Sequence, residues 1–308
     1  AADDPIFLAM NQRGQQEAQL GDFCIKCHAP MAVRTGATSD GLNVADLPKH
    51  LKGVTCYFCH SVSGVGDTHN NPLQLADDLV LRGAIVDPVD NPAHLAAYSP
   101  FQDRDRRESS QLCGSCHDIK LPNGVHLEKT FAEWKESLFG NGSTQALNCS
   151  NCHMQGSKGT AADFAGVLVR EVHDHTWPAV DVALTAFAQQ DEQLALVERE
   201  VKSGIIGQIC VGATLDKTPI TVVLENGFAG HSIPSGAAQD RRLWVELKAY
   251  QDDKLIFSSG VVPDGTPAAA VAATDPTMWL FRDKLLGDGG AEVHMFWDTK
   301  SIESNVLP

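Results

Sequence analysis

Four copies of one short pattern constrain this chain more than any other feature of its sequence. In each copy two cysteines stand three positions apart, and a histidine directly follows the second cysteine. The copies are Cys24-Ile-Lys-Cys27-His28, Cys56-Tyr-Phe-Cys59-His60, Cys113-Gly-Ser-Cys116-His117 and Cys149-Ser-Asn-Cys152-His153. Eight of the nine cysteines in the 308-residue chain belong to these four motifs. The fold must therefore provide four chemically similar sites.

The order Cys-x-x-Cys-His is the attachment signature of c-type haem (heme c). The two thiols form thioethers with the vinyl groups of one porphyrin, and the adjacent histidine binds the iron. A Cys-x-x-Cys pair alone also occurs in zinc sites and in redox disulfides, but neither requires a histidine after every second cysteine. The motifs predict four covalently bound haem c groups, each with its iron. The attaching residues are Cys24, Cys27, Cys56, Cys59, Cys113, Cys116, Cys149 and Cys152, and the proximal iron ligands are His28, His60, His117 and His153.

Charge and hydropathy exclude several classes of partner. The formal net charge of −15 argues against nucleic acid, which binds basic surfaces. An acidic surface most often serves solubility, and steering of basic partners is the alternative. No apolar run approaches the roughly 18 residues that a membrane-spanning helix needs, so no transmembrane segment is predicted. Covalent haem attachment takes place outside the cytoplasm, and "AADDP" resembles the start of a processed chain. The predicted location is extracellular or at the cell surface, with the periplasm as the alternative.

The motifs divide the chain into two predicted domains of an α+β protein. All four fall within residues 1–203, which we expect to form a loop-rich, partly helical tetrahaem c-type cytochrome domain whose porphyrins supply much of the core. Three helices are predicted there: one from Asp4-Pro5 to Gly21, one from a capping box at Thr130 to Gly140, and one over 181–203.

Residues 204–308 have a different composition. The segments "TPITVVLENG", "RRLWVELKAY", "KLIFSSG" and "AEVHMFW" are β-branched and aromatic, which predicts a β-sandwich-like domain with a hairpin turn at "QDDK". Cys210 lies in the apolar stretch "GIIGQICVG", where we expect an inert, buried thiol. The final "SIESNVLP" lacks the pattern of a closing strand, so we expect a shortened chain or a last strand supplied by a neighbour.

Eight further histidines compete for the distal face of each iron. His173 and His175 are two residues apart, so an extended backbone would separate their Cα atoms by about 6.6 Å and aim the rings at two haems. A polar loop with two incidental histidines is the alternative. His94 precedes the third motif in a turn-to-helix context, and His231 lies in a Gly/Pro-rich loop where a ligand and an ordinary turn histidine stay equally open. The remaining histidines are His50, held as a reserve ligand, and His69, His126 and His294, expected to be solvated or structural.

These features together resemble the multihaem c-type cytochromes that join a four-haem module to an immunoglobulin-like β domain. The matching segments are "CIKCHAPMAV", "GVTCYFCHSV", "PAHLAAYSP", "LCGSCHDI", "FAEWKES", "CSNCHM", "HDHTWP" and "GHSIPSG". The resemblance implies bis-histidine haems with His94, His173, His175 and His231 as distal ligands, the last supplied by the C-terminal domain. Some members of this group polymerise into extracellular conductive filaments, and others are soluble carriers.

The sequence therefore predicts an electron-transfer protein and not an enzyme, because two imidazoles on each iron leave no open position for a substrate. The favoured form is a subunit of an extracellular cytochrome filament, with other redox proteins and further copies of the chain as partners. One alternative is a soluble periplasmic electron carrier. The other is a multihaem oxidoreductase with one open haem acting on a small nitrogen or sulfur compound.

Overall fold

The computed structural model describes residues 2–67, 69–214 and 216–308. It mixes helix and sheet, 26 % and 24 % of the chain, which confirms the α+β class. The chain separates into two compact units, the first made of residues 1–120 and 129–203 and the second of 121–128 and 204–308. The break between residues 203 and 204 coincides with the predicted domain boundary, whereas residues 121–128, predicted within the domain 1–203, belong to the second unit.

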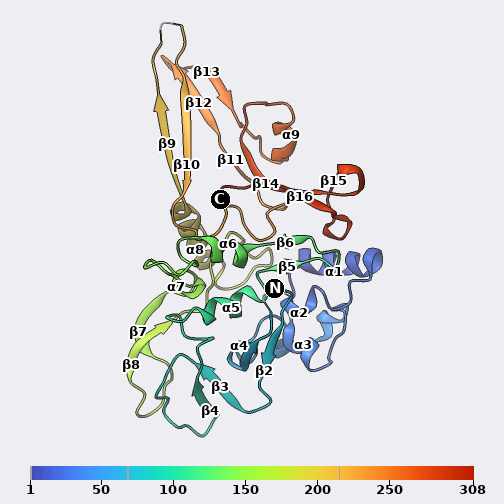
Figure 1. The fold of residues 1–308 in the computed structure, drawn as a ribbon, viewed down its shortest axis with the longest axis vertical. Helices are drawn as coiled ribbons and strands as arrows, with labels where there is room; N and C mark the ends of the chain where they lie inside the picture. The colour runs from blue at the N-terminus through green and yellow to red at the C-terminus, as the bar shows by residue number, and fades with distance from the viewer. Residues whose placement is uncertain (1, 68, 215) are drawn as a thin grey trace. The chain divides into compact units, whose positions relative to one another are not determined.

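The first unit is built from short elements (Figure 1). Most of its helices have only one or two turns: α1 (Pro5–Ala18), α2 (Ile25–His28), α3 (Pro30–Arg34), η1 (Val44–Asp46), η2 (Lys49–Leu51), α4 (Cys56–His60), α5 (Glu108–Gly114), α6 (Thr130–Glu136), α7 (Cys149–His153) and α8 (Gln190–Gly204). Its strands are β1 (Val62–Val65), β2 (Leu73–Leu75), β3 (Val80–Gly83), β4 (Leu95–Tyr98), β5 (Ile119–Lys120), β7 (Gly156–Thr160) and β8 (Val169–His173). β1 pairs with β2 and β7 with β8 in antiparallel fashion, whereas β3 and β4 are parallel.

Helix α1 begins where the sequence predicts. The Asp4 carboxylate accepts hydrogen bonds from the backbone N–H groups of Ile6 and Phe7, at 2.9 and 3.1 Å, and Pro5 occupies the first helical position. The helix ends at Ala18, because Gln19 turns into the left-handed region with φ 51°, and the predicted end at Gly21 is therefore wrong.

The other two predicted helices differ more. The N-cap of α6 is Lys129 and not the predicted Thr130, and the helix stops at Glu136 and not at Gly140. Helix α8 starts at Gln190 and not near residue 181. The reason is local, because the Gln190 side chain donates to the carbonyl of Ala183 and thus holds the preceding segment in an irregular path.

Two small apolar clusters form the core of the first unit. One contains Ile25, from between the cysteines of the first motif, with the buried neighbours Ala2, Ala29, Ala32, Val44 and Leu47. The other contains Phe58, from between the cysteines of the second motif, with Val62 and Leu73. Both residues are at most 1 % exposed. The variable positions of these two motifs therefore anchor their helical turns in the protein.

The chain as a whole buries little of its surface. It exposes 18159 Å², whereas a monomer of this mass typically exposes about 12,600 Å², and two separate globules of the sizes of the two units about 15,000 Å². Many large apolar side chains contribute to the excess: within the first unit Leu79 is 77 % exposed, Val86 73 % and Leu95 64 %. The polypeptide by itself thus leaves apolar surface for something else to cover.

The second unit is mainly strands (Figure 1). Its elements are β6 (His126–Glu128), β9 (Ile205–Val211), β10 (Ile220–Asn226), β11 (Leu243–Trp244), β12 (Leu247–Gln251), β13 (Lys254–Ser259), α9 (Ala268–Ala272), β14 (Leu280–Leu286), η3 (Asp288–Gly290), β15 (Glu292–Val293), η4 (Phe296–Asp298) and β16 (Ser301–Asn305). β9 and β10 form one antiparallel hairpin, and β12 and β13 form another. β14 pairs with β11, β15 and β16, and its inward positions Phe281, Asp283 and Leu285 are buried.

The turn and the closing strand of the second unit can be compared with the sequence predictions. The "QDDK" turn is confirmed, since Asp252 and Asp253 have φ values of 47° and 64° between β12 and β13. The expectation that "SIESNVLP" lacks a closing strand is wrong, because β16 pairs with β14 along its whole length. Its polar, mostly exposed side chains hide the strand from a hydrophobic pattern.

Gly114 tests how tightly the third motif is packed. A Cβ atom at this position would lie 2.3 Å from Cγ of Phe131, which is 4 % exposed, so Gly114→Ala should destabilise the first unit by about 1–3 kcal/mol. Chemical denaturation of the purified protein measures the change. Gly83→Ala is the matched control, because a Cβ there meets no atom within 4 Å. Equal losses in the two variants would contradict the packing described here.

Candidate haem-attachment site

Each of the four motifs takes up about one turn of helix. α4 and α7 coincide with Cys56–His60 and Cys149–His153, and α2 starts directly after Cys24, which itself has helical φ and ψ of −80° and −50°. The third motif continues the end of α5, with Ser115 at φ −57° and ψ −31°. Residues three apart share one face of a helix, so both thiols of a motif project to the same side. This placement suits attachment to one flat molecule.

Short capping contacts explain why two of the turns form. The Thr55 hydroxyl, one residue before Cys56, accepts from the N–H of Phe58 at 3.4 Å. Asn148, one residue before Cys149, forms a reciprocal capping box with Asn151, and its N–H donates to the Asn151 side chain at 2.7 Å. A polar residue before the first cysteine therefore satisfies backbone groups at the start of the turn.

Two motif histidines have a ring nitrogen held by the backbone. Nδ1 of His60 lies 2.5 Å from the carbonyl oxygen of Arg82, and Nδ1 of His153 lies 2.8 Å from that of Pro178. A carbonyl oxygen only accepts hydrogen bonds, so each ring donates from Nδ1, and in the neutral form of the ring the lone pair is on Nε2. Histidines that bind metals through Nε2 are typically oriented in this way.

The ring of His28 is held by stacking and burial, whereas those of His60 and His153 are held by backbone carbonyls. Its ring stacks on Phe7, with the ring centroids 4.4 Å apart. Burial is the main cause that lowers the pKa of His28 to about 4, so its imidazole is neutral at neutral pH. The neutral imidazole is the form that binds a metal ion.

The motif cysteines form no disulfide with one another, and thiols of different motifs influence each other. Cys27 is the first cause that raises the pKa of Cys116, and Cys149 is the first cause that raises the pKa of Cys113. Burial raises the pKa of Cys24 and of Cys59 to about 11. The third motif thus lies near both the first and the fourth, an arrangement that spacing along the chain does not reveal.

Polar side chains hold these motifs together. Asn71 is buried; its N–H donates to the carbonyl of Ser115 at 2.7 Å, and its side-chain amide donates to the carbonyl of Lys26. The Ser110 hydroxyl accepts from the N–H of Cys149 at 3.1 Å and donates to Asn148. Sequence reasoning missed Asn71 and Ser110, because neither belongs to a motif and their partners are distant in the chain.

The predicted distal ligands of the first unit lie in different settings. His94 is exposed and precedes strand β4, not a helix, so the predicted turn-to-helix context is wrong. Its Nδ1 lies 3.1 Å from the carbonyl oxygen of Leu95. His175 lies just beyond the end of β8, and its ring centroid is 6.4 Å from that of His60. The structure therefore brings one predicted distal histidine close to the histidine of the second motif.

His173 has a different hydrogen-bonding partner from the other candidates. Its Nδ1 lies 2.8 Å from Nη1 of Arg104, which also pairs with Glu171 at 3.3 Å. A guanidinium only donates, so the neutral His173 ring accepts at Nδ1 and carries its proton on Nε2. Binding a metal through Nε2 would require this ring to leave Arg104 or to lose that proton. Of the candidates with a described Nδ1 partner, His173 is the least prepared for such binding.

The remaining candidates are placed as follows. His231 belongs to the second unit; its Nδ1 lies 3.0 Å from the carbonyl oxygen of Ser232, and its own carbonyl accepts from Asn226 at 2.6 Å. His50 lies in η2 and is exposed. Nδ1 of His69 lies 3.3 Å from the carboxylate of the buried Asp118, which supports its predicted structural role. Cys210 is exposed on β9, so its predicted burial is wrong.

Among the described residues, no group of three or more His, Cys, Asp or Glu side chains is arranged to hold a metal ion. A haem site does not need such a group, because the porphyrin supplies four of the iron ligands and the protein adds only the axial ones. The paired thiols and the oriented imidazoles of the motifs are the donor set that covalent haem requires, and the first unit exposes large apolar side chains such as Leu79, Val86 and Leu95.

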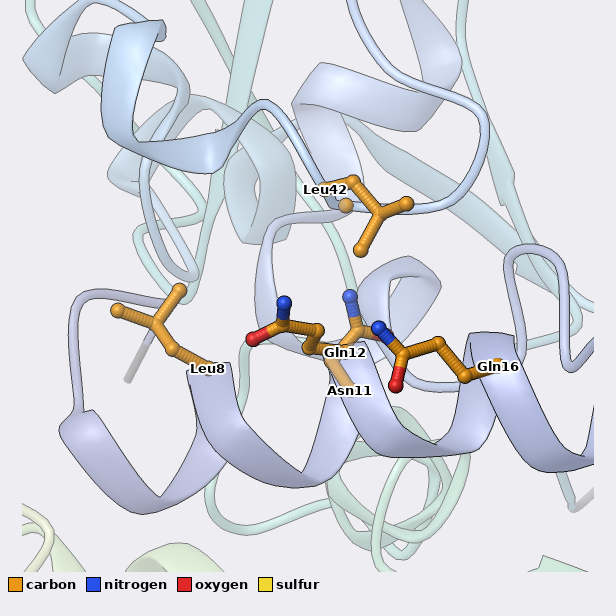
Figure 2. Close-up of a pocket in the computed structure, with 6 residues that line it drawn as sticks. Leu8, Asn11, Gln12, Gln16 and Leu42 are labelled. Atoms are coloured by element: carbon orange, nitrogen blue, oxygen red, sulfur yellow. The ribbon is translucent and has the colours of Figure 1, made fainter.

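A cavity of about 330 Å³ in the first unit lies apart from this chemistry (Figure 2). Leu8, Gln12 and Gln16 face it from one side of α1, opposite Leu42. Buried Asn11 also lines it and donates to the carbonyl of Asp40 at 2.8 Å. None of the described residues that line this cavity is a cysteine or a histidine, so we do not assign it to the motifs.

Comparison with known proteins adds no further identification: no protein-family model, no curated protein and no solved structure matches this chain. Within the described residues, no helix is long and apolar enough to cross a membrane.

Proposed function

We propose that this chain transfers electrons through four covalently bound haem c groups. The observation that carries the proposal is a fourfold one: each motif places two thiols on one side of a helical turn and an imidazole next to them. Haem iron supplies reversible one-electron chemistry when it is bound. The residues of this chain attach the ring, fix the axial imidazoles and exclude water.

The motif residues have distinct tasks in this proposal. The eight motif cysteines form the thioethers, and His28, His60, His117 and His153 bind the irons on the proximal side. The carbonyl contacts of His60 and His153 increase the electron donation of those imidazoles, which favours a low reduction potential. His94, His173, His175 and His231 are the proposed distal ligands. Two imidazoles on each iron close it to substrates, so we propose a carrier and not an enzyme.

The excess surface supports the same proposal. A chain that exposes 18159 Å² must cover apolar side chains with something other than its own residues. Four porphyrins would cover a large part of this surface in the first unit, which we propose is a tetrahaem cytochrome domain. Haem attachment also implies a location outside the cytoplasm. For the second unit we propose a β-sandwich-like domain built from its hairpins and its four-stranded sheet.

Self-association into an extracellular filament is the favoured form of this function. The two hairpins of the second unit expose apolar side chains: Ile209 is 64 % exposed and Val211 66 % on β9, and Ile256 is 58 % exposed on β13. A two-stranded hairpin is marginally stable in water, and an exposed apolar hairpin pairs readily with another chain. We propose a second copy of this chain as the partner, with other redox proteins as donors and acceptors.

An oxidoreductase with one open haem is the second candidate. The Arg104 contact of His173 favours it, because a distal histidine held away from iron would leave one position open. A soluble periplasmic electron carrier is the form that remains if the chain does not self-associate.

The mass of the mature protein tests the haem count. After denaturation, the chain should retain the mass of four covalently attached porphyrins in intact-protein mass spectrometry, because thioethers survive unfolding. Replacing Cys149 and Cys152 with alanine should leave three. Cys210→Ala is the control and should leave four, because Cys210 lies outside the motifs. Polypeptide mass alone in the wild-type protein would refute the proposed function.

Spin state tests the distal ligands. The wild-type protein should contain only low-spin ferric haem by electron paramagnetic resonance and should not bind cyanide at rest. His175→Ala should convert one haem of four to a high-spin form that binds cyanide, because its iron loses an imidazole. His294→Ala should change nothing. High-spin haem in the wild-type protein would instead favour the oxidoreductase.

Sedimentation velocity tests self-association. We expect the wild-type protein to form species larger than a monomer at micromolar concentration. Ile209→Lys should shift the distribution towards monomer, because a charge then occupies the exposed face of β9. Ser301→Lys, at an exposed position of β16, is the control. A wild-type protein that stays monomeric with every iron ligated internally would rule out the filament.

A further inference from the structure

The loop between β1 and β2 reaches two of the motifs through a single asparagine. The backbone N–H of Asn71 donates to the carbonyl of Ser115 at 2.7 Å, and its side-chain amide donates to the carbonyl of Lys26. Ser115 lies between the cysteines of the third motif, and Lys26 lies between those of the first. Asn71 is only 9 % exposed, so one buried residue joins two motif turns that are distant in the sequence.

Asn70 fixes the same loop to the segment that follows the third motif. Its backbone N–H donates to the carbonyl of Asp118 at 3.1 Å. Its side-chain amide donates to the carbonyl of Lys120 at 2.8 Å, and its side-chain oxygen accepts from the N–H of Lys120 at 3.1 Å. The loop is therefore held on the side of the third motif, and Asn71 extends from it to the first motif.

The backbone of the two asparagines has a conformation that most side chains disfavour. The φ values of Asn70 and Asn71 are 59° and 56°, in the left-handed region, which asparagine adopts more readily than most other residues. Glycine adopts this region freely. Asn71→Gly therefore keeps the backbone path and the N–H bond to Ser115, and it removes only the side-chain bond to Lys26.

The hairpin that carries the loop is anchored beside the second motif. Val62 of β1 and Leu73 of β2 pack with Phe58, which lies between the cysteines of that motif. The guanidinium of Arg34, the last residue of α3, donates to the carbonyl of Leu73. The base of the hairpin is therefore fixed, and its loop holds the first and third motifs from a rigid support.

We propose that Asn71 is a positioning residue that sets the orientation of the first motif relative to the third, and with it the orientation of the two haems that these motifs would carry. The inference rests on the proposed function. Functional groups keep a defined geometry when hydrogen bonds around them lock their supports. Loss of the bond to Lys26 changes the arrangement of this haem pair without removing an attaching cysteine or an axial histidine.

Circular dichroism in the Soret region tests the proposal on the haem-loaded protein. Two porphyrins that lie close together in a fixed orientation give a Soret band with one positive and one negative lobe. We expect this band in the wild-type protein and a loss of its amplitude in Asn71→Gly, with four haems still found by intact-protein mass spectrometry. Gln19→Gly is the matched control, because it removes an exposed carboxamide at φ 51° in the same unit.

The outcomes separate this inference from the proposed function. A Soret band of equal amplitude in Asn71→Gly and in the wild-type protein would overturn the positioning role, and so would a wild-type band without two lobes. An equal loss in Gln19→Gly would also overturn it. Fewer than four haems in the wild-type protein would instead count against the proposed function.

Hydrogen-exchange mass spectrometry tests the joint between the motifs without relying on the haem signal. In full-length Asn71→Gly, the backbone amides of residues 24–28 and 113–117 should exchange several-fold faster than in the wild-type protein. Those of residues 149–153 should keep the wild-type rate, because Asn71 makes no bond to the fourth motif. Faster exchange in only one of the first two segments, or equal acceleration in all three, would contradict the proposal.

Discussion

A single helical turn places two thiols on one side of the backbone and an imidazole beside them, and the first unit repeats this arrangement four times. The surrounding residues hold these turns in place by apolar packing and by hydrogen bonds. Ile25 and Phe58, the variable residues of two motifs, are the centres of the two small apolar clusters. The carbonyls of Arg82 and Pro178 orient the imidazoles of the second and fourth motifs. The motif turns therefore carry the reactive side chains of this unit, and two of them also contribute residues to its apolar core.

The limited core follows from the same design. Short elements joined by irregular segments bury few apolar residues, and the chain exposes far more area than its length requires. Apolar side chains left in contact with water would normally destabilise a fold of this size. Covalent porphyrins would replace the missing core, which is why the proposed cofactors and the architecture of the first unit depend on each other.

Close packing of four motifs also brings reactive groups together. Asn71 bonds to the carbonyls of Lys26 in the first motif and Ser115 in the third, and Ser110 on α5 accepts from the N–H of Cys149 in the fourth. In the proposed function, such proximity would favour electron transfer between neighbouring haem groups.

The sequence by itself determined the features that depend on neighbouring residues: the four motifs, the N-cap at Asp4, the turn at Asp252 and Asp253, and the α+β class. Tertiary structure decided the partner of each side chain. Arg104 and His173 are 69 positions apart in the sequence, and Asn71 and Lys26 are 45 positions apart. A local sequence pattern therefore cannot predict either contact. The strand β16 was hidden for a related reason, since its pairing with β14 comes from backbone hydrogen bonds, which polar residues make as readily as apolar ones.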